Sequence, residues 1–390
     1  MLMHVLIIPS EHFVTPRYPL GGIFQFQQAK ALHDAGYQVG LIAVGIITPR
    51  FFFRKYDYPY FEDVNGYPVF RRYVRKFYPQ RWERPARSIP FYKNLGLDLY
   101  QKYKERFGVP DVIHAHNVQF AGFVAQAIQE SEGVPYIVTE HSSKFRTGLI
   151  AREWFSPIKK VFQQASALTA VSQALANNID RHCGGQCADV LYNIVDSFLL
   201  DSPLKDRSSL GSGFCFLNIA SLDANKDQYS LLTAFAKHFK GKQVSLRIGG
   251  SGPLERHLKR LAQRLGVQGQ VIFLGYLDRP SVLREMQEAD CFVLSSRQET
   301  FGVVLIEALA CGTPVIATRC GGPEEIVNNK NGLLVLPRDP VALGEAMVRM
   351  VAGSSQYSPE ALRSGCRVHF GEKAFIANVG RYYNKAVSLA

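Results

Sequence analysis

Two glutamates eight residues apart are the residues of this chain whose type and spacing most directly indicate chemistry. Glu299 lies in polar sequence, and Glu307 lies inside an apolar run. The residues between them predict a turn into a helix that begins at about Gly302 and ends at about Cys311, with Thr300 as its N-cap. Glu299 is then at the mouth of the helix, and Glu307 is two turns further along.

The mouth of a helix presents unpaired backbone N–H groups and a partial positive charge, and both suit a phosphate group. A carboxylate beside such a mouth is unsuited to phosphate, but it accepts hydrogen bonds from hydroxyl groups. The glutamate pair therefore predicts a ligand that carries both phosphates and hydroxyls, such as a sugar nucleotide.

The elements that must position this pair are those of a soluble two-domain protein. The chain has 390 residues, of which 47% are apolar and 20% are charged, and this length fits two domains of ordinary size. No apolar run reaches the roughly 18 residues of a membrane-spanning helix. The first eight residues predict a buried strand rather than a signal peptide. The seven cysteines lie mostly in apolar runs, which favours reduced thiols and a cytoplasmic protein.

The net charge of +12 is concentrated in one segment, from Arg50 to Phe107. This segment holds 14 Lys or Arg against 6 Asp or Glu, and 18 of the 46 aromatic residues. Basic residues interleaved with aromatics favour contact with an anionic membrane surface. The alternative is an irregular insertion with a local aromatic core and solvated charges. No nucleic-acid-binding module accompanies the charge, so no nucleic-acid partner is predicted.

Short apolar runs alternate with amphipathic stretches along the whole chain, which is typical of parallel βαβ units. The sequence therefore predicts an α/β protein with two doubly wound, Rossmann-like domains that face each other across a cleft. A polar tract from Asp196 to Gly213 indicates the boundary, so we expect domains at residues 1–200 and 201–373 and a C-terminal helix at about 374–390 that returns to the first domain. Ligands of such sheets bind at the carboxyl ends of the strands.

Two common nucleotide-binding motifs are absent from the sequence. Gly250-Ser251-Gly252 lacks the third glycine of the dinucleotide-binding fingerprint, and no Gly-Lys-Ser/Thr of a P-loop occurs. An oxidoreductase or a P-loop enzyme is therefore not predicted.

Glycines and polar side chains instead follow several predicted strands. In the first half, Gly21-Gly22 and a polar cluster of Glu140, His141 and Ser142 occupy such turns. His116 is expected just past a strand end and facing the ligand, whereas His114 is expected to alternate with it and to be buried. In the second half, the turns contain Ser221 with Lys226, Gly250 with Gly252, and Gly321-Gly322. Several turns of this kind in two domains are far less probable by chance than one such turn, so together they favour a binding site.

These residues together resemble a known enzyme family. The stretch from Ser295 to Gly322 closely resembles the signature of the retaining glycosyltransferases of family 4, also called group 1, which have the GT-B fold and use nucleotide-sugar donors. The resemblance extends over nearly the whole chain through Gly22, His116, Lys226 and the glycine turns.

The resemblance implies roles for the matching residues. Glu307 would hold the ribose hydroxyls, while Glu299 and His116 would contact the donor sugar. Lys226 would stabilise the leaving diphosphate, as would the helix N–H groups of Phe301, Gly302 and Val303. Gly22, Ser221, Gly250 and Gly252 would complete the donor site, and Glu140, His141 and Ser142 would bind the acceptor. Family members need no metal and no cofactor beyond a donor such as a UDP- or GDP-sugar.

One position departs from the family pattern. Many members carry an arginine five residues before the phosphate-binding lysine, and here that residue is Ser221. Removing one preorganised charge from a leaving group costs about 3–4 kcal/mol, so we expect a replacement. Arg247, Arg297 and Arg319 are the candidates, and the sequence does not choose among them.

The leading hypothesis is a retaining hexosyltransferase in cell-surface polysaccharide synthesis, with a glycan or lipid-linked acceptor. We expect it in the cytoplasm, on the inner face of the plasma membrane. The alternatives are a phosphorylase or sugar-nucleotide epimerase on the same scaffold, and a non-catalytic partner subunit that retains the nucleotide site.

Overall fold

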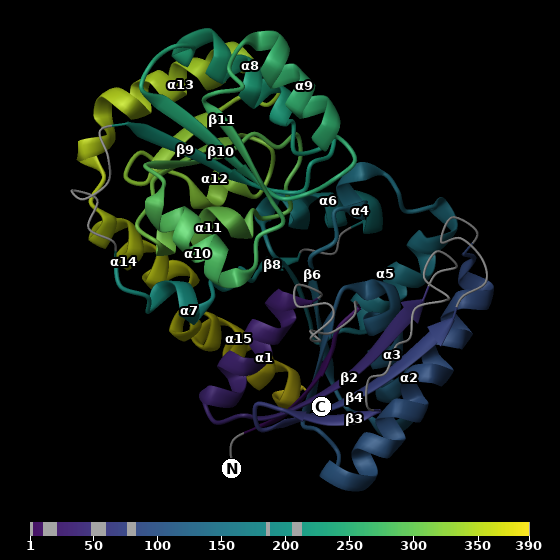
Figure 1. Cartoon of the computed structure of the whole chain (residues 1–390). Helices are drawn as coiled ribbons and strands as arrows, with labels where there is room; N and C mark the ends of the chain where they lie inside the picture. Colours follow the sequence, from purple (N-terminus) through teal and green to yellow (C-terminus); the bar gives the residue numbers. More distant parts are fainter. Residues whose placement is uncertain are drawn as a thin grey trace. The chain divides into compact units, whose positions relative to one another are not determined.

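The computed structural model describes residues 3–10, 22–47, 60–75, 83–184, 188–204 and 213–389 (Figure 1). The chain divides into two compact units. Unit 1 comprises Met1–Ile194 and Glu372–Ala390, and unit 2 comprises Val195–Gly371. The division predicted from the sequence, at residues 200 and 373, differs from this one by a few residues at each point. Residues 205–212 of the predicted polar boundary lie outside the described residues.

Unit 1 contains, among its described residues, an eight-stranded sheet in the order β3-β4-β2-β1-β5-β6-β7-β8. Its strands are β1 (His4–Ile8), β2 (Gln38–Ile47), β3 (Phe61–Val64), β4 (Tyr67–Arg75), β5 (Val112–His116), β6 (Tyr136–Glu140), β7 (Ala167–Ala170) and β8 (Asp189–Val190). Neighbouring strands are parallel, except that β3 and β4 form an antiparallel hairpin. The carboxyl ends of the parallel strands consequently lie along one edge of the sheet.

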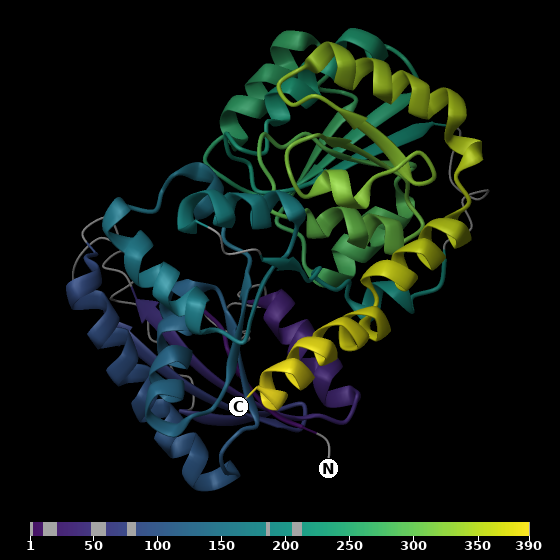
Figure 2. The same ribbon diagram turned by 180° about the vertical axis from the view of Figure 1, so that it is seen from behind.

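One face of this sheet packs on helices α1 (Ile23–Asp34) and α15 (Glu372–Ser388), which run beside each other (Figure 2). Val5 and Ile7 alternate along β1 and join Val379 of α15 in one buried apolar cluster. This period of two places every second residue of a strand on the same face. The C-terminal helix, expected at about 374–390, is α15.

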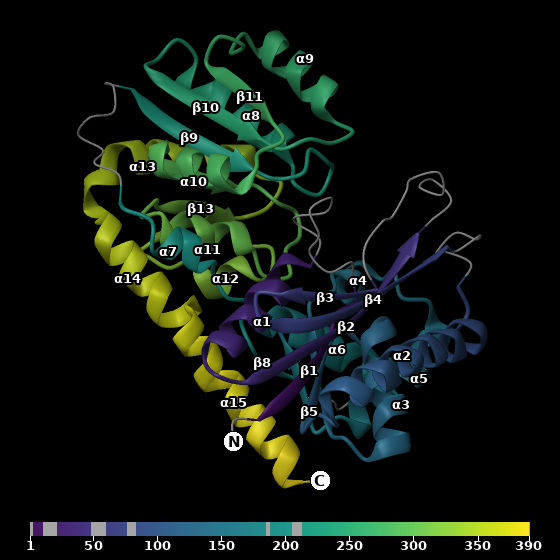
Figure 3. The ribbon, with the colours of Figure 1, turned by 60° about the horizontal axis from the view of Figure 1, so that its bottom comes forward.

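Helix α2 (Pro85–Phe107) packs on β2 and β4 and contacts α3 (Phe123–Glu132) (Figure 3). Its buried residues recur at helical spacing, as in Leu95, Leu99 and Tyr103. The other helices of unit 1 include α4 (Lys144–Thr147), α5 (Phe155–Gln164) and α6 (Gln173–Cys183).

The basic aromatic segment is regular where the structure describes it, with β3, β4 and α2, and not an irregular insertion. The Phe70 ring lies against the rings of Phe61, Tyr103 and Phe107, which makes a local aromatic core. Arg71 is buried and pairs with Glu62. Further cations pair with carboxylates in Arg72–Asp98, Lys93–Glu130 and Lys104–Glu132. Residues 50–59 and 76–82 lie outside the described residues, and membrane contact stays a prediction.

Unit 2 contains a six-stranded parallel sheet in the order β11-β10-β9-β12-β13-β14, counted over its described residues. Its strands are β9 (Phe214–Ile219), β10 (Val244–Gly249), β11 (Val271–Gly275), β12 (Cys291–Leu294), β13 (Val315–Thr318) and β14 (Gly332–Val335). The chain order reverses between β9 and β12. This crossing point is where doubly wound sheets bind their ligands, outside the carboxyl ends of the strands.

Helices cover both faces of this sheet (Figure 1). One group consists of α8 (Gln228–Phe239), α9 (Glu255–Leu265) and α13 (Pro340–Gly353). The other contains α10 (Arg279–Glu288), α11 (Val303–Ala310) and α14 (Pro359–Phe370). The short helices α7 (Ser197–Leu200) and α12 (Pro323–Ile326) complete the described part of the unit. No described helix of either unit is long and apolar enough to cross a membrane.

Candidate active site

Glycines bring the turns after β9 and β10 together at the carboxyl edge of the unit 2 sheet. A Cβ atom on Gly250 would lie 1.9 Å from the carbonyl oxygen of Ala220, and one on Gly252 would lie 2.4 Å from that of Leu222. Only glycine permits such close approach of two backbone segments. The protein's own packing therefore requires both glycines, and their contact with a donor remains a prediction.

The turn that enters α11 is built differently from the predicted one. Thr300 is not the N-cap; Gly302 occupies that position with a left-handed backbone (φ 101°) and no side-chain cap. The cause is a backbone bridge between Glu299 and Gly321, which holds residue 299 extended, so the chain reverses later. The first N–H groups of α11 therefore follow the glycine directly. Phe301 is buried, and Val303 is the first residue of the helix.

Lys226 and Glu299 meet at this helix mouth. The Lys226 ammonium group donates to Oε1 of Glu299 at 2.5 Å, and the Ser296 hydroxyl donates to the same oxygen at 2.7 Å. Both charged side chains are partly exposed, 22% for Lys226 and 13% for Glu299. The structure thus joins two residues that lie 73 positions apart in the chain. A cation and a carboxylate here can serve a diphosphate and a sugar hydroxyl respectively.

Glu307 lies one helix turn deeper and is almost fully buried. Burial raises the pKa of its carboxyl group, and the guanidinium of Arg279 opposes that rise. The Nη1 atom of Arg279 donates to Glu307 Oε1 at 2.5 Å, and Nη2 donates to Asp196 Oδ2 at 2.6 Å. Sequence reasoning did not assign Arg279 or Asp196 to the site, because Arg279 lies 28 positions from Glu307 and 83 positions from Asp196, and neither residue belongs to a motif.

At the position where many family members carry an arginine, the Ser221 hydroxyl donates to Asp223. Arg247 is held by two carboxylates of α10, Glu285 and Glu288. Arg297 lies on the Lys226 loop, because its backbone N–H donates to the Asn225 carbonyl at 2.7 Å and its guanidinium contacts Asp227 at 3.2 Å. Of the candidates for the missing charge, Arg297 is therefore the one that the structure joins to Lys226.

In unit 1, the two histidines of β5 share a face, and the expectation that His114 alternates with His116 is wrong. Residues two apart on a strand point the same way, and the two rings lie 4.2 Å apart. His116 is the last residue of β5 and not a residue beyond it, and both side chains are fully buried. Burial lowers the pKa of His114 to about 3 and also lowers that of His116.

The two histidines belong to a set of polar contacts that joins β5 to β6, to the residue after β6 and to helix α15. His114 bonds to the hydroxyls of Tyr383 on α15 (2.8 Å) and Thr139 (2.7 Å). His116 Nδ1 lies 3.0 Å from His141 Nε2, while His116 Nε2 is buried and has no hydrogen-bond partner. An unsatisfied buried nitrogen is costly, and a ligand that binds at this strand end would remove that cost.

The predicted acceptor residues follow the neighbouring strand, β6. Glu140 is fully buried, and its Oε1 accepts from the backbone N–H of Val118 at 2.5 Å. The His141 ring stacks on Phe24 of α1, and Ser142 is partly exposed. Gly22 precedes α1 with a left-handed backbone (φ 66°), and Gly21 lies outside the described residues. Acceptor binding by this cluster stays a prediction.

Glu140 should make the stability of the protein fall as the pH rises. Burial raises its pKa from 4.5 to about 7, so the folded state holds a proton there that the unfolded state releases. The stabilisation is complete below pH 4.5 and is lost as the pH rises through 7, a loss of roughly 3 kcal/mol. Replacing Glu140 with Gln should abolish this part of the loss, as measured by urea unfolding at pH 5 and pH 8. An equal loss in both proteins would contradict it.

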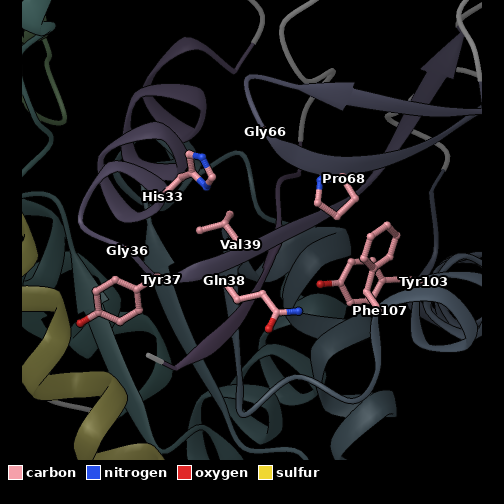
Figure 4. Close-up of a pocket in the computed structure, with 9 residues that line it drawn as sticks. All are labelled: His33, Gly36, Tyr37, Gln38, Val39, Gly66, Pro68, Tyr103 and Phe107. Carbon is pink, nitrogen blue, oxygen red and sulfur yellow. The ribbon is translucent and has the colours of Figure 1, made fainter. Parts of the chain in front are cut away.

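A separate pocket of about 400 Å³ lies at the other end of the unit 1 sheet (Figure 4). Gln38 at the start of β2 and Pro68 at the start of β4 line it, together with Tyr103 and Phe107 from the end of α2. It contains none of the residues predicted to act in the site. A doubly wound sheet binds its ligands at the opposite, carboxyl edge, so we assign no function to this pocket.

The two units match two family models, in agreement with this site. Residues 23–197 match the model described as Glycosyltransferase Family 4, and residues 205–362 match the model described as Glycosyl transferases group 1. Together the matches extend over most of the chain. The chain belongs to the family 4, group 1 glycosyltransferases, and it is a glycosyltransferase with the GT-B fold.

Similar proteins agree with this membership. A putative teichuronic acid biosynthesis glycosyltransferase, TuaC of Bacillus subtilis, is 27% identical over 86% of this chain and 88% of its own length. The structure resembles sucrose-phosphate synthase from Thermosynechococcus elongatus (TM-score 0.75, 20% identity, 99% of this chain and 100% of that one). It also resembles Anabaena HepE in complex with UDP and glucose (TM-score 0.71, 20% identity, 98% of this chain and 99% of that one).

Proposed function

We propose that this chain is a retaining glycosyltransferase that moves a hexose from a nucleotide-sugar donor to a glycan or lipid-linked acceptor in cell-surface polysaccharide synthesis. The observation that carries the proposal is the meeting of Lys226 and Glu299 at the mouth of α11, with Glu307 buried one turn below. Each group suits one part of a sugar nucleotide: Lys226 suits the diphosphate, Glu299 the sugar, and Glu307 the ribose.

The proposed chemistry follows from where charge develops. The departing diphosphate gains negative charge, which Lys226 and the N–H groups of α11 would stabilise. The sugar becomes positively charged in the transition state, and the Glu299 carboxylate would stabilise that charge. When the diphosphate arrives, it would draw Lys226 away from Glu299 and free this carboxylate for the sugar. The acceptor hydroxyl would then attack from the face that the diphosphate leaves, which retains the configuration of the sugar.

In unit 1, His116 is proposed to contact the donor sugar. Its unpartnered Nε2 is suited to a sugar hydroxyl, and the nearby cluster of Glu140, His141 and Ser142 would receive the acceptor. A neutral imidazole donates or accepts a hydrogen bond without adding charge, and the lowered pKa of His116 keeps it neutral.

The similar proteins support the donor class and a role in polysaccharide synthesis. HepE was solved with UDP and glucose, and the name of TuaC assigns it to the synthesis of a polysaccharide, teichuronic acid. We propose further that the reaction needs no metal and that the protein works in the cytoplasm, at the inner face of the plasma membrane. The membrane part depends on residues 50–107, and six of the nine described Lys and Arg residues there form ion pairs.

A thermal-shift screen of UDP, GDP, ADP and their sugars tests the donor class. We expect one nucleotide and its sugars to raise the melting temperature of the protein, because a ligand that binds only the folded state stabilises it. A screen in which no nucleotide raises the melting temperature would contradict the proposal.

A further inference from the structure

A chain of three charged side chains, of which Glu307 is buried and the other two are partly buried, lies behind the proposed ribose site of unit 2. Arg279 forms its centre, and its two terminal nitrogens are divided between Glu307 (2.5 Å) and Asp196 (2.6 Å). The side chains are 23%, 10% and 21% exposed respectively. A guanidinium that serves two carboxylates at these distances is fixed in both position and orientation.

Each member of this chain is anchored by a helix. Arg279 is the first residue of α10, whose start is capped by Asp278 through the N–H of Ser281 at 3.0 Å. Glu307 lies in the middle of α11, and Asp196 caps α7 through the N–H of Phe198 at 3.0 Å. Three helix positions therefore determine where the Glu307 carboxylate points.

The Glu307 carboxylate uses only one of its oxygens in this contact. Among the described residues, its Oε1 accepts from Arg279 and its Oε2 accepts no hydrogen bond. A carboxylate oxygen can accept hydrogen bonds from hydroxyl groups. The two neighbouring hydroxyls of a ribose are donors of this kind.

We propose that Arg279 is a positioning residue for donor binding: it holds one oxygen of Glu307 so that the other is presented to the ribose hydroxyls of the nucleotide. This inference rests on the proposed function of the site. It assigns Arg279, which contacts no part of the donor in this scheme, a defined effect on affinity.

Burial raises the pKa of Glu307, and the charge of Arg279 opposes this rise. The charged groups that act on this carboxyl from the described elements around α11 are Arg279 on α10 and Asp196 before α7. From α14, Arg363 and Cys366 donate to backbone carbonyls of α11. Without Arg279, burial and the Asp196 charge both favour protonation of Glu307, and a protonated carboxyl is a poorer acceptor. Donor affinity should then depend on pH.

Calorimetric titration with whichever of UDP, GDP or ADP binds the wild-type protein tests this inference. Replacing Arg279 with Met should weaken binding about ten- to hundredfold at neutral pH, and the affinity should recover as the pH rises from 6 to 9. The wild-type affinity should change little over this range. The 2′- and 3′-deoxy forms of the nucleotide should bind the wild-type protein more weakly than the parent, and the variant should hardly distinguish them.

Arg247→Met is the matched control. Arg247 also lies in unit 2, is equally exposed at 23%, and pairs with two carboxylates, but these belong to α10. The Arg247→Met substitution should lower the stability of the protein, but it should not cause a pH-dependent loss of affinity for the nucleotide. Arg279→Lys keeps the positive charge but loses the two separate nitrogens that contact the two carboxylates. It should therefore weaken nucleotide binding less than Arg279→Met does, and its affinity should not depend on pH.

The inference is overturned if Arg279→Met binds as wild type does, or loses no more affinity than Arg247→Met. If Arg279→Met does not fold, Arg279→Lys takes its place in the test. An affinity of Arg279→Lys that equals that of the wild-type protein at every pH would also overturn the inference. A wild-type affinity in both Glu307→Ala and Glu307→Gln would instead refute the ribose role of Glu307, and with it the proposed function of the site.

Discussion

Replacing Lys226 with Met is expected to lower kcat by about 10²–10³-fold, or roughly 3–4 kcal/mol, with a smaller change in donor affinity. The diphosphate gains its extra charge as the bond to the sugar breaks, so the ammonium group acts mainly in the transition state. Ser221 occupies the position where many family members carry an arginine, so Lys226 supplies a larger share of the charge that faces the diphosphate in this scheme. Single-turnover measurement of sugar release from the donor gives this rate directly.

Lys259→Met provides the control for the loss of a lysine. Lys259 also pairs with a glutamate, Glu255 at 2.7 Å, but it lies exposed on α9. Its removal should leave kcat within about twofold of wild type, because an exposed pair of this kind contributes little. A wild-type kcat in Lys226→Met would remove this residue from the proposed mechanism.

Replacing Glu307 with Ala should raise the donor KM about ten- to hundredfold and change kcat much less. Hydroxyls of the ribose lie away from the bond that breaks, so their contacts stabilise the bound donor and the transition state equally. The substitution also leaves the Arg279 guanidinium without one of its two carboxylates. Steady-state kinetics with varied donor measure both constants.

Glu307→Gln separates the loss of charge from the loss of the side chain. It keeps the volume of the buried group and one acceptor oxygen, so its KM should lie between those of wild type and Glu307→Ala. An unchanged donor KM in both variants would contradict the ribose role.

The sequence predicted the parallel strands and the helices between them because their apolar periods are strong and local. Helix α2 was not predicted from the sequence. Pro90 lies inside this helix, and basic and aromatic residues obscure the apolar spacing of Leu95 and Leu99. The proline interrupts the pattern expected of a helix interior, yet packing on β2, β4 and α3 maintains the helix. Tertiary contacts thus outweighed local preference.

The composition of the site was predictable, but its geometry was not. Glu299, Gly302 and Glu307 lie within one motif, so their proximity follows from the helix itself. Thr300 is a good capping residue, but the bridge from Glu299 to Gly321 moves the turn to Gly302. No local pattern contains such a long-range contact.

The polar groups behind the site show the same limit. Arg279 joins Glu307 to Asp196 across three helices, and neither its neighbours in sequence nor its residue type indicate that role. The error at His114 was of another kind. The period of two along a strand already places it on the same face as His116, and the ring stacking confirms this.

The central claim is that unit 2 binds a nucleotide sugar whose transfer retains configuration. Early-time NMR of the sugar released when the donor reacts slowly with water tests it most directly, because water replaces the unknown acceptor. We predict that the first anomer to appear has the configuration of the donor sugar, and that Lys226→Met slows its release by about 10²–10³-fold. Initial release of the opposite anomer would contradict a retaining mechanism.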